Sequence, residues 1–237
     1  MTGADKNLPQ KSSKAAIDAF LEKVSSTPVT KSAGERGRLI FAMDATASRE
    51  PAWDRACHIQ GEMFKETAAL GGLDIQLCYY RGFGEFKASQ WLSSSDELLK
   101  RMTSVSCQGG YTQIEKVLRH AIKQTKQKKF QALVFVGDCM EEDVDRLCQI
   151  AGELGMLGVP AFLFHEGAEP VAQRAFKQIA RLTRGAYCSF DATSAGQLRD
   201  LLKAVAVYAA GGQSALQDFS KDRSGLVQKL TSQLGKD

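Results

Sequence analysis

Two nonpolar runs stand out in the hydrophobic pattern, and each ends abruptly at an aspartate. The mostly nonpolar residues 38–43 lead into Asp44, and residues 130–137 lead into Asp138. Runs of this length without polar alternation predict strands that are buried on both faces, as in a parallel sheet covered by helices. Both aspartates are therefore expected at the carboxyl ends of buried strands.

Shorter nonpolar segments predict the remaining strands, at residues 73–80, 159–165 and 186–190. Residues 83–91 predict one more. Only a short turn containing Gly82 separates it from the strand before, so this pair is expected to be antiparallel.

Nonpolar residues at helical spacing separate these strands. They fall within residues 53–64, 95–104, 114–122, 144–154, 170–184 and 198–208. Strands that alternate with amphipathic helices predict a doubly wound α/β fold. We expect a mostly parallel sheet with one antiparallel edge strand and helices on both faces.

The chain divides into one predicted domain, residues 37–212, and two polar flanks. In the N-terminal extension, residues 1–36, nonpolar side chains from Ile17 to Val24 recur at helical spacing and predict a helix that packs on the domain or on a partner. In the C-terminal tail, residues 213–237, nonpolar residues are spaced as in a short helix.

The composition and charge of the chain exclude several classes of function. The chain has 237 residues and a net charge of +4, with no arginine stripe interleaved with aromatics of the kind that binds nucleic acid. It shows neither a signal-peptide pattern at its N-terminus nor a nonpolar run of membrane-spanning length. Its six cysteines are scattered without a C-x-x-C pair, which is typical of a cytoplasmic protein with reduced thiols.

The first candidate metal ligands lie where the first buried strand ends. Asp44, Thr46 and Ser48 bring three oxygen-bearing side chains within five residues. Ligands bind at the carboxyl ends of strands in open α/β sheets, and oxygen ligands suit a hard divalent cation such as Mg²⁺. The alternative is that Asp44 only forms a turn and Ser48 only caps the next helix.

Two further elements are expected at the same edge of the sheet. Gly109 and Gly110 precede Thr112 and predict a tight loop that presents a hydroxyl. Thr112 has an alternative role as a plain helix cap. The second element is Asp138. Together with the first motif, these elements supply two carboxylates and three hydroxyls.

This pattern resembles the von Willebrand factor A (VWA) domain and its metal-ion-dependent adhesion site. That family has Asp-x-Ser-x-Ser, a threonine after a glycine-rich loop, and an aspartate ending the fourth strand. Asp44, Ser48, Thr112 and Asp138 match, while Thr46 replaces the usual serine and keeps the hydroxyl. Cys139 follows Asp138 where glycine is commoner, a departure expected to matter little for ligation. The resemblance spans about residues 37–210.

The resemblance implies a metal site and a function. Thr46, Ser48 and Thr112 would hold Mg²⁺ or Mn²⁺ directly, and Asp44 and Asp138 partly through water. Hydroxyl ligands are neutral, so the ion keeps charge to attract an Asp or Glu side chain of a protein partner. Bacterial cytoplasmic members of the family act as adaptors in multiprotein assemblies, some with AAA+ ATPases. An interaction module without enzymatic activity is therefore expected, with no role for nucleic acid or membrane.

Two other functions remain open at this stage. One is a Mg²⁺-dependent phosphatase with Asp44 as nucleophile, although a haloacid-dehalogenase-like pattern needs a second acid where Thr46 stands. The other is a structural scaffold with a degenerate metal site.

Several side chains near the site are expected to have structural roles only. Glu141 and Glu142 are expected to favour a helix N-terminus. His165 is expected at the surface, and Tyr80 and Phe83 are expected to pack on the sheet.

Overall fold

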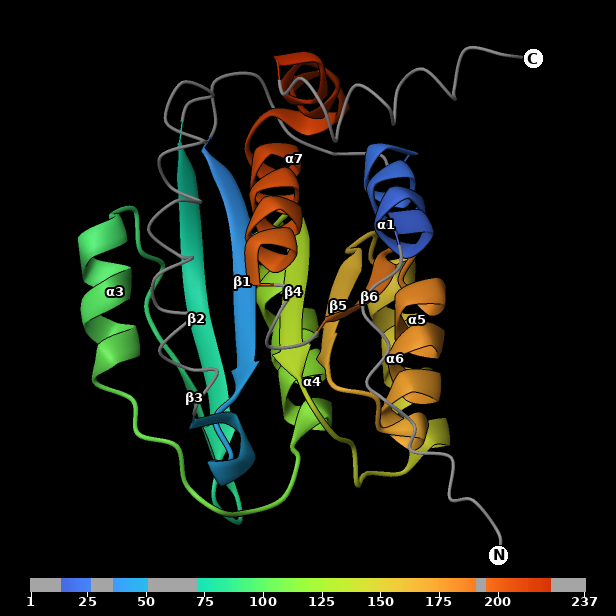
Figure 1. Ribbon diagram of the computed structural model, residues 1–237. Coiled ribbons are helices and arrows are strands. Elements are labelled where there is room, and N and C mark those ends of the chain that lie inside the picture. Colours follow the sequence, from blue (N-terminus) through green and yellow to red (C-terminus); the bar gives the residue numbers. More distant parts are fainter. Residues whose placement is uncertain (1–13, 27–35, 51–71, 191–194, 223–237) are drawn as a thin grey trace, which may run out of the picture.

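A computed structural model describes residues 14–26, 36–50, 72–190 and 195–222 (Figure 1). Within them, one six-stranded sheet runs in the order β3-β2-β1-β4-β5-β6, and only the β2–β3 pair is antiparallel. The strands are β1 (Gly37–Asp44), β2 (Leu73–Arg81), β3 (Glu85–Ala88), β4 (Ala132–Gly137), β5 (Ala161–Glu166) and β6 (Ala186–Phe190). The predicted doubly wound fold is confirmed.

Helices cover both faces of the sheet (Figure 1). One core cluster draws its nonpolar residues from α1, α3 and α7, and the other from α4, α5 and α6. The helices are α1 (Lys14–Ser26), α3 (Ser95–Thr103), α4 (Ile114–Gln127), α5 (Val144–Met156), α6 (Pro170–Leu182) and α7 (Ala195–Asp222), with a short 3₁₀ helix η1 (Ala47–Arg49). In the described part of the chain, none of them is long and nonpolar enough to cross a membrane.

Strand β1 explains why its sequence shows no polar alternation. It pairs in parallel with β2 on one side and β4 on the other, and every one of its residues is buried. Leu39, Phe41 and Met43 face one core cluster, while Ile40 and Ala42 face the other. A strand between two helical layers needs nonpolar side chains on both faces.

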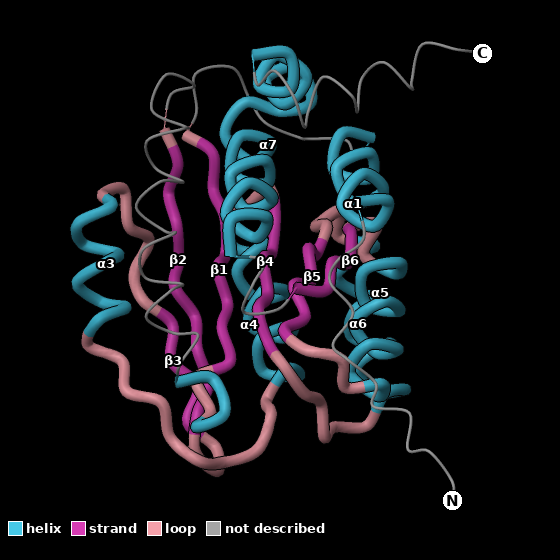
Figure 2. Tube along the Cα trace, in the orientation of Figure 1, coloured by secondary structure: helices cyan, strands magenta, loops and turns pink. Residues whose placement is uncertain are grey.

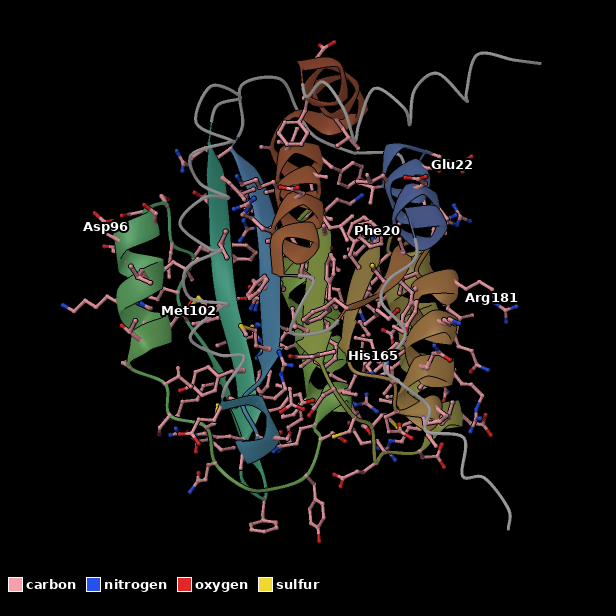
Figure 3. All side chains as sticks on the ribbon, in the orientation of Figure 1. Phe20, Glu22, Asp96, Met102, His165 and Arg181 are labelled. Atoms are coloured by element: carbon pink, nitrogen blue, oxygen red, sulfur yellow. The ribbon has the colours of Figure 1, made fainter. Side chains whose placement is uncertain are left out.

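The N-terminal helix α1 packs on the domain, which is one of the two arrangements that its sequence allowed. Its Phe20 ring lies 5.9 Å from the ring of Phe162 and 5.2 Å from that of Phe164, measured between centroids. Figure 3 labels Phe20 between α1 and the sheet. Val24, one turn further on, is fully buried in the same cluster. Nonpolar burial therefore holds α1 against the rest of the fold.

Some element boundaries differ from those predicted. The edge strand β3 is shorter than residues 83–91, because Gly82 and Gly84 form a turn with positive φ angles before it. Helix α7 continues past Gly212, which kinks it with φ 77°. The helix predicted within residues 53–64 and the one predicted in the tail lie outside the described residues.

Candidate metal centre

The loops that carry the predicted site gather at one edge of the sheet. Figure 2 shows the segments that follow β1, β2 and β4 at the same end, together with the loop from α3 to α4. Strands β1 and β4 are parallel neighbours with Met43 opposite Val136, so Asp44 and Asp138 leave the sheet side by side. One ligand atom each from Asp44, Asp138 and Cys139 all lie within 4.8 Å of one another.

Asp44 is fully buried, and both of its carboxylate oxygens accept hydrogen bonds. The backbone N–H of Thr46 donates to Oδ1 at 2.7 Å, and the Tyr80 hydroxyl donates to Oδ2 at 3.0 Å. Burial raises the pKa of Asp44, while the hydrogen bonds from Thr46 oppose that rise. Asp44 therefore forms the turn named in the alternative interpretation, and Tyr80 adds a polar contact that the sequence did not indicate.

The two hydroxyls of the first motif lie together. Thr46 Oγ1 and Ser48 Oγ are 3.2 Å apart, close enough for a hydrogen bond. The turn that Asp44 makes with Thr46 leads directly into η1, which contains Ser48. The motif thus folds back on itself and clusters its oxygen atoms at the end of β1.

Thr112 is joined to the loop that follows Asp138. Its backbone N–H donates to Glu141 Oε2 at 3.1 Å, and its hydroxyl accepts from the Glu141 N–H at 3.0 Å. The first N–H groups of α4, from Ile114 and Glu115, instead donate to Glu142 at 2.6 and 2.8 Å. The interpretation of Thr112 as only a helix cap is therefore wrong, because Glu142 fills that role.

The loop before Thr112 is also fixed to β1 and to the β2–β3 turn. Gln108 N–H donates to Ala45 O at 3.0 Å, and Tyr111 N–H donates to Gly82 O at 3.3 Å. A Cβ on Gly110 would lie 2.0 Å from Gly82 O, so only glycine allows this close approach. The tight loop predicted from the glycines thus forms, and it joins the segment before Thr112 to the residue after Asp44.

Sequence reasoning missed Arg49. This arginine is 2% exposed and forms an ion pair with Glu166 at the end of β5. Burial lowers the pKa of Arg49, and the negative charges of Asp138 and Asp44 oppose that shift. Glu166 ends a parallel strand at this edge, but no local pattern in the sequence links it to Arg49.

His165 contradicts its surface prediction, because it is fully buried (Figure 3). Its Nε2 lies 3.0 Å from the carbonyl oxygen of Asp138, and its Nδ1 lies 3.0 Å from the Tyr187 hydroxyl. A carbonyl only accepts, so Nε2 carries the proton and Nδ1 accepts from Tyr187. Burial lowers the pKa of His165, which favours this neutral form. The ring therefore fixes the backbone at Asp138.

The residues present fit a hard divalent cation. Asp138 Oδ1 is buried and has no hydrogen-bond partner among the described residues, which leaves a charged oxygen to be satisfied. Two carboxylates and neighbouring hydroxyls are oxygen donors of the kind that Mg²⁺ prefers. The Cys139 sulfur also lies within 4.8 Å of a carboxylate oxygen of Asp44 and of Asp138, so it is a further candidate ligand atom. Burial and the neighbouring carboxylates raise the pKa of Cys139 to about 12, so its thiol stays protonated without a metal.

Comparisons with known proteins identify the fold. No protein-family model matches the sequence, and no curated protein is similar to it in sequence. Among solved structures, the SpRpn10 VWA domain aligns with a TM-score of 0.56 at 12% identity, over 75% of this chain and 98% of its own. The chain has a von Willebrand factor A-like fold.

Two other structures share the VWA-like fold. The PilB minor pilin from Streptococcus sanguinis aligns with a TM-score of 0.57 at 10% identity, over 78% of this chain and 64% of its own. Proximal thread matrix protein 1 from the mussel byssus, solved with a zinc-occupied MIDAS motif, aligns with a TM-score of 0.57 at 14% identity, over 76% of this chain. The chain spans less than half of that protein, 46%. Identities this low establish the fold alone.

Proposed function

We propose that this chain is a metal-dependent protein-interaction module without enzymatic activity. In this proposal, Mg²⁺ or Mn²⁺ is held by Asp44, Thr46, Ser48, Thr112 and Asp138. The observation that carries the proposal is the buried Oδ1 of Asp138, which has no hydrogen-bond partner among the described residues and lies beside Asp44. A buried carboxylate oxygen without a partner is costly unless a cation satisfies it.

The proposed ligands also suggest what the ion does. Three of the five are neutral hydroxyls, so the bound ion keeps positive charge and attracts a strong anionic oxygen. The proposed ligand is an Asp or Glu side chain of a partner protein. One neighbour in the comparison, the mussel byssus protein, carries a metal in its MIDAS motif, which supports metal binding by this fold.

We extend the proposal to the cellular role. SpRpn10 and the human COPII-coat protein Sec24c share the fold, the latter at a TM-score of 0.52 and 13% identity. A coat protein belongs to a multiprotein assembly, which supports a role for this chain as an adaptor in one. We propose that it acts in the cytoplasm of bacteria, and that an AAA+ ATPase is one class of partner.

The phosphatase alternative finds little support in the geometry. A nucleophilic carboxylate must contact the phosphorus atom of its substrate directly. Asp44 is fully buried, which opposes direct contact with a phosphate ester, whereas a small ion can bind through water or through a lone pair that the two hydrogen bonds leave. The scaffold alternative differs from our proposal in one measurable property, since a degenerate site does not bind metal.

Isothermal titration calorimetry of the whole chain with MgCl₂ and MnCl₂ tests the metal site. We expect binding by the wild type, loss of binding by Asp138→Ala, and unchanged binding by Asp96→Asn, a control in the exposed first turn of α3. A pulldown from the source cell with and without EDTA then tests the partner. Wild-type protein that binds neither metal would support the scaffold, and partners retained in EDTA would contradict metal-dependent docking.

A further inference from the structure

Two aromatic side chains protrude into solvent next to the candidate metal centre. Phe83 is 82% exposed and Tyr111 is 61% exposed. Their rings contact each other edge to face, with centroids 5.3 Å apart and an interplanar angle of 73°. The prediction that Phe83 packs on the sheet is therefore wrong. Large aromatic rings are usually buried, so a mutually supported exposed pair calls for a functional explanation.

The backbone holds this aromatic pair in place. Phe83 sits in the turn between β2 and β3, directly after Gly82, whose φ angle is 59°. Gly82 O accepts from Tyr111 N–H at 3.3 Å and from Gln113 Nε2 at 3.3 Å. The close approach of Gly110 to Gly82 then leaves no space between the two loops. The contacts between the two loops therefore hold both rings in their exposed positions.

The pair borders the residues proposed to bind metal. Tyr111 immediately precedes Thr112, and the same loop is hydrogen-bonded to Ala45, the residue after Asp44. A partner segment that reached the metal with a carboxylate would therefore lie next to the two rings. The two rings and the proposed metal ligands therefore belong to loops that are hydrogen-bonded to one another at the same end of the sheet.

Charge around the rings favours an acidic segment. The exposed Lys116 donates to Gly84 O at 2.7 Å, which anchors its ammonium group beside the Phe83 turn. Arg81 and Lys87 share the single carboxylate of Glu85, at 3.0 and 3.1 Å. Around the Phe83 turn, three cations therefore face one carboxylate, and electrostatic complementarity there favours a negatively charged partner segment, whereas Glu141 and Glu142 supply negative charge beside Thr112.

We propose that Phe83 and Tyr111 form a second contact for the same partner, one that binds a nonpolar or aromatic side chain close in sequence to the metal-binding acid. This inference rests on the proposed function. The recognised ligand is an acidic peptide segment with a nonpolar residue near its Asp or Glu. Aromatic residues are frequent energetic centres of interfaces, which fits this role.

The test uses phage-displayed random short peptides, selected on the immobilised full chain in MgCl₂ and in EDTA. Wild-type protein is compared with Phe83→Ser/Tyr111→Ser and with Met156→Ser, a control of equal exposure at the end of α5 (84%). We expect Mg²⁺-dependent peptides that combine an acid with a nonpolar residue. Their affinity for the double variant should fall about fivefold or more, and Met156→Ser should leave it unchanged. Metal affinity, measured by calorimetry, should be the same in all three proteins.

The outcomes separate this inference from the function on which it rests. Mg²⁺-dependent peptides that share only the acid, or that bind the double variant as tightly as the wild type, overturn the aromatic contact and leave the metal-dependent module standing. Peptides that bind equally in EDTA overturn both. Loss of metal binding in the double variant would also overturn the inference, because the rings would then serve the metal centre itself.

Discussion

The buried guanidinium of Arg49 forms an ion pair with the carboxylate of Glu166. Arg49 ends η1, just after the Asp44 motif, and Glu166 ends β5, so the pair ties together two loops on either side of β4. It also brings a fixed positive charge near the two aspartates of the candidate metal centre. The pair is therefore expected to hold this edge of the sheet in shape.

A double-mutant cycle tests this structural role. Arg49→Met removes the ion pair from the partly buried Glu166 carboxylate, which should lower the free energy of unfolding by up to about 3 kcal/mol. Adding Glu166→Gln removes the negative charge that Arg49 had balanced, so the double variant should be more stable than Arg49→Met alone. Urea unfolding of the four proteins measures the coupling. Strictly additive effects would show that the two side chains stabilise the fold independently.

Metal should stabilise the wild-type protein against heat. An ion that binds only the folded state at one hundred times its Kd adds about 2.7 kcal/mol of stability. We expect MgCl₂ or MnCl₂ to raise Tm, EDTA to reverse the rise, and Asp44→Ala to abolish it. Differential scanning fluorimetry measures these shifts, with Asp96→Asn as the matched control. An equal rise in Asp44→Ala would assign the ion to another site.

Cys139 should decide which metals bind well. Its sulfur lies among the candidate ligand atoms, and thiolates favour Zn²⁺ over Mg²⁺. We expect Cys139→Ser to weaken Zn²⁺ binding and to leave Mg²⁺ and Mn²⁺ binding unchanged. Cys148→Ser, on the surface of α5, is the control. Weaker Mg²⁺ binding in Cys139→Ser would mean that this position shapes the oxygen ligands as well.

The sequence predicted well those elements that depend on a local pattern of nonpolar residues. Strands β1 and β4 are continuous nonpolar runs, and the rule that ligands bind at the carboxyl ends of strands correctly brought Asp44 and Asp138 together. Features that depend on contacts between distant segments were missed. The burial of Arg49 depends on Glu166, 117 positions away in the chain, and no local pattern reports such a pair.

The same distinction explains the errors at single side chains. His165 ends the predicted strand, where exposure is common, but in the structure it is buried and contacts Tyr187 and the backbone of Asp138. Phe83 belongs to a nonpolar segment, yet the turn at Gly82 directs it into solvent. In both cases, tertiary contacts or backbone geometry override the average behaviour of the residue type.

The pH dependence of stability should include a contribution from Glu115. Hydrogen bonds from Arg146 and Arg119 lower the pKa of this glutamate below its usual value. Because the folded pKa is the lower one, the stabilisation is present above the unfolded pKa of about 4.3 and is lost as pH falls through the folded pKa. Solvent screening limits it to below about 1 kcal/mol.

Glu115→Gln should therefore destabilise the protein slightly at pH 7, and its difference from the wild type should shrink as the pH is lowered below 4. Urea unfolding at both pH values measures this change. Glu97→Gln, on α3, provides the control. A difference that stays constant with pH would show that the ion pairs of Glu115 contribute nothing.

Thr112 should matter more for metal and partner binding than for folding. Its hydroxyl accepts one hydrogen bond, from Glu141 N–H, and the side chain is only 5% exposed. Thr112→Val keeps the volume and removes the hydroxyl, which should cost about 1 kcal/mol of stability. If the hydroxyl also binds the ion, partner affinity should fall by about 2–5 kcal/mol, the usual cost of disrupting a buried charged contact.

Thr112→Ser separates these two roles, because it restores the hydroxyl without the methyl group. We expect the serine variant to recover metal affinity in calorimetry and to recover affinity for the partner found in the EDTA-sensitive pulldown. The valine and serine variants should have similar unfolding midpoints, whereas their affinities for metal and partner should differ clearly. If Thr112→Val loses stability but binds metal and partner as the wild type does, then Thr112 serves only to join its loop to Glu141, and the ion would have to be held by the remaining four residues.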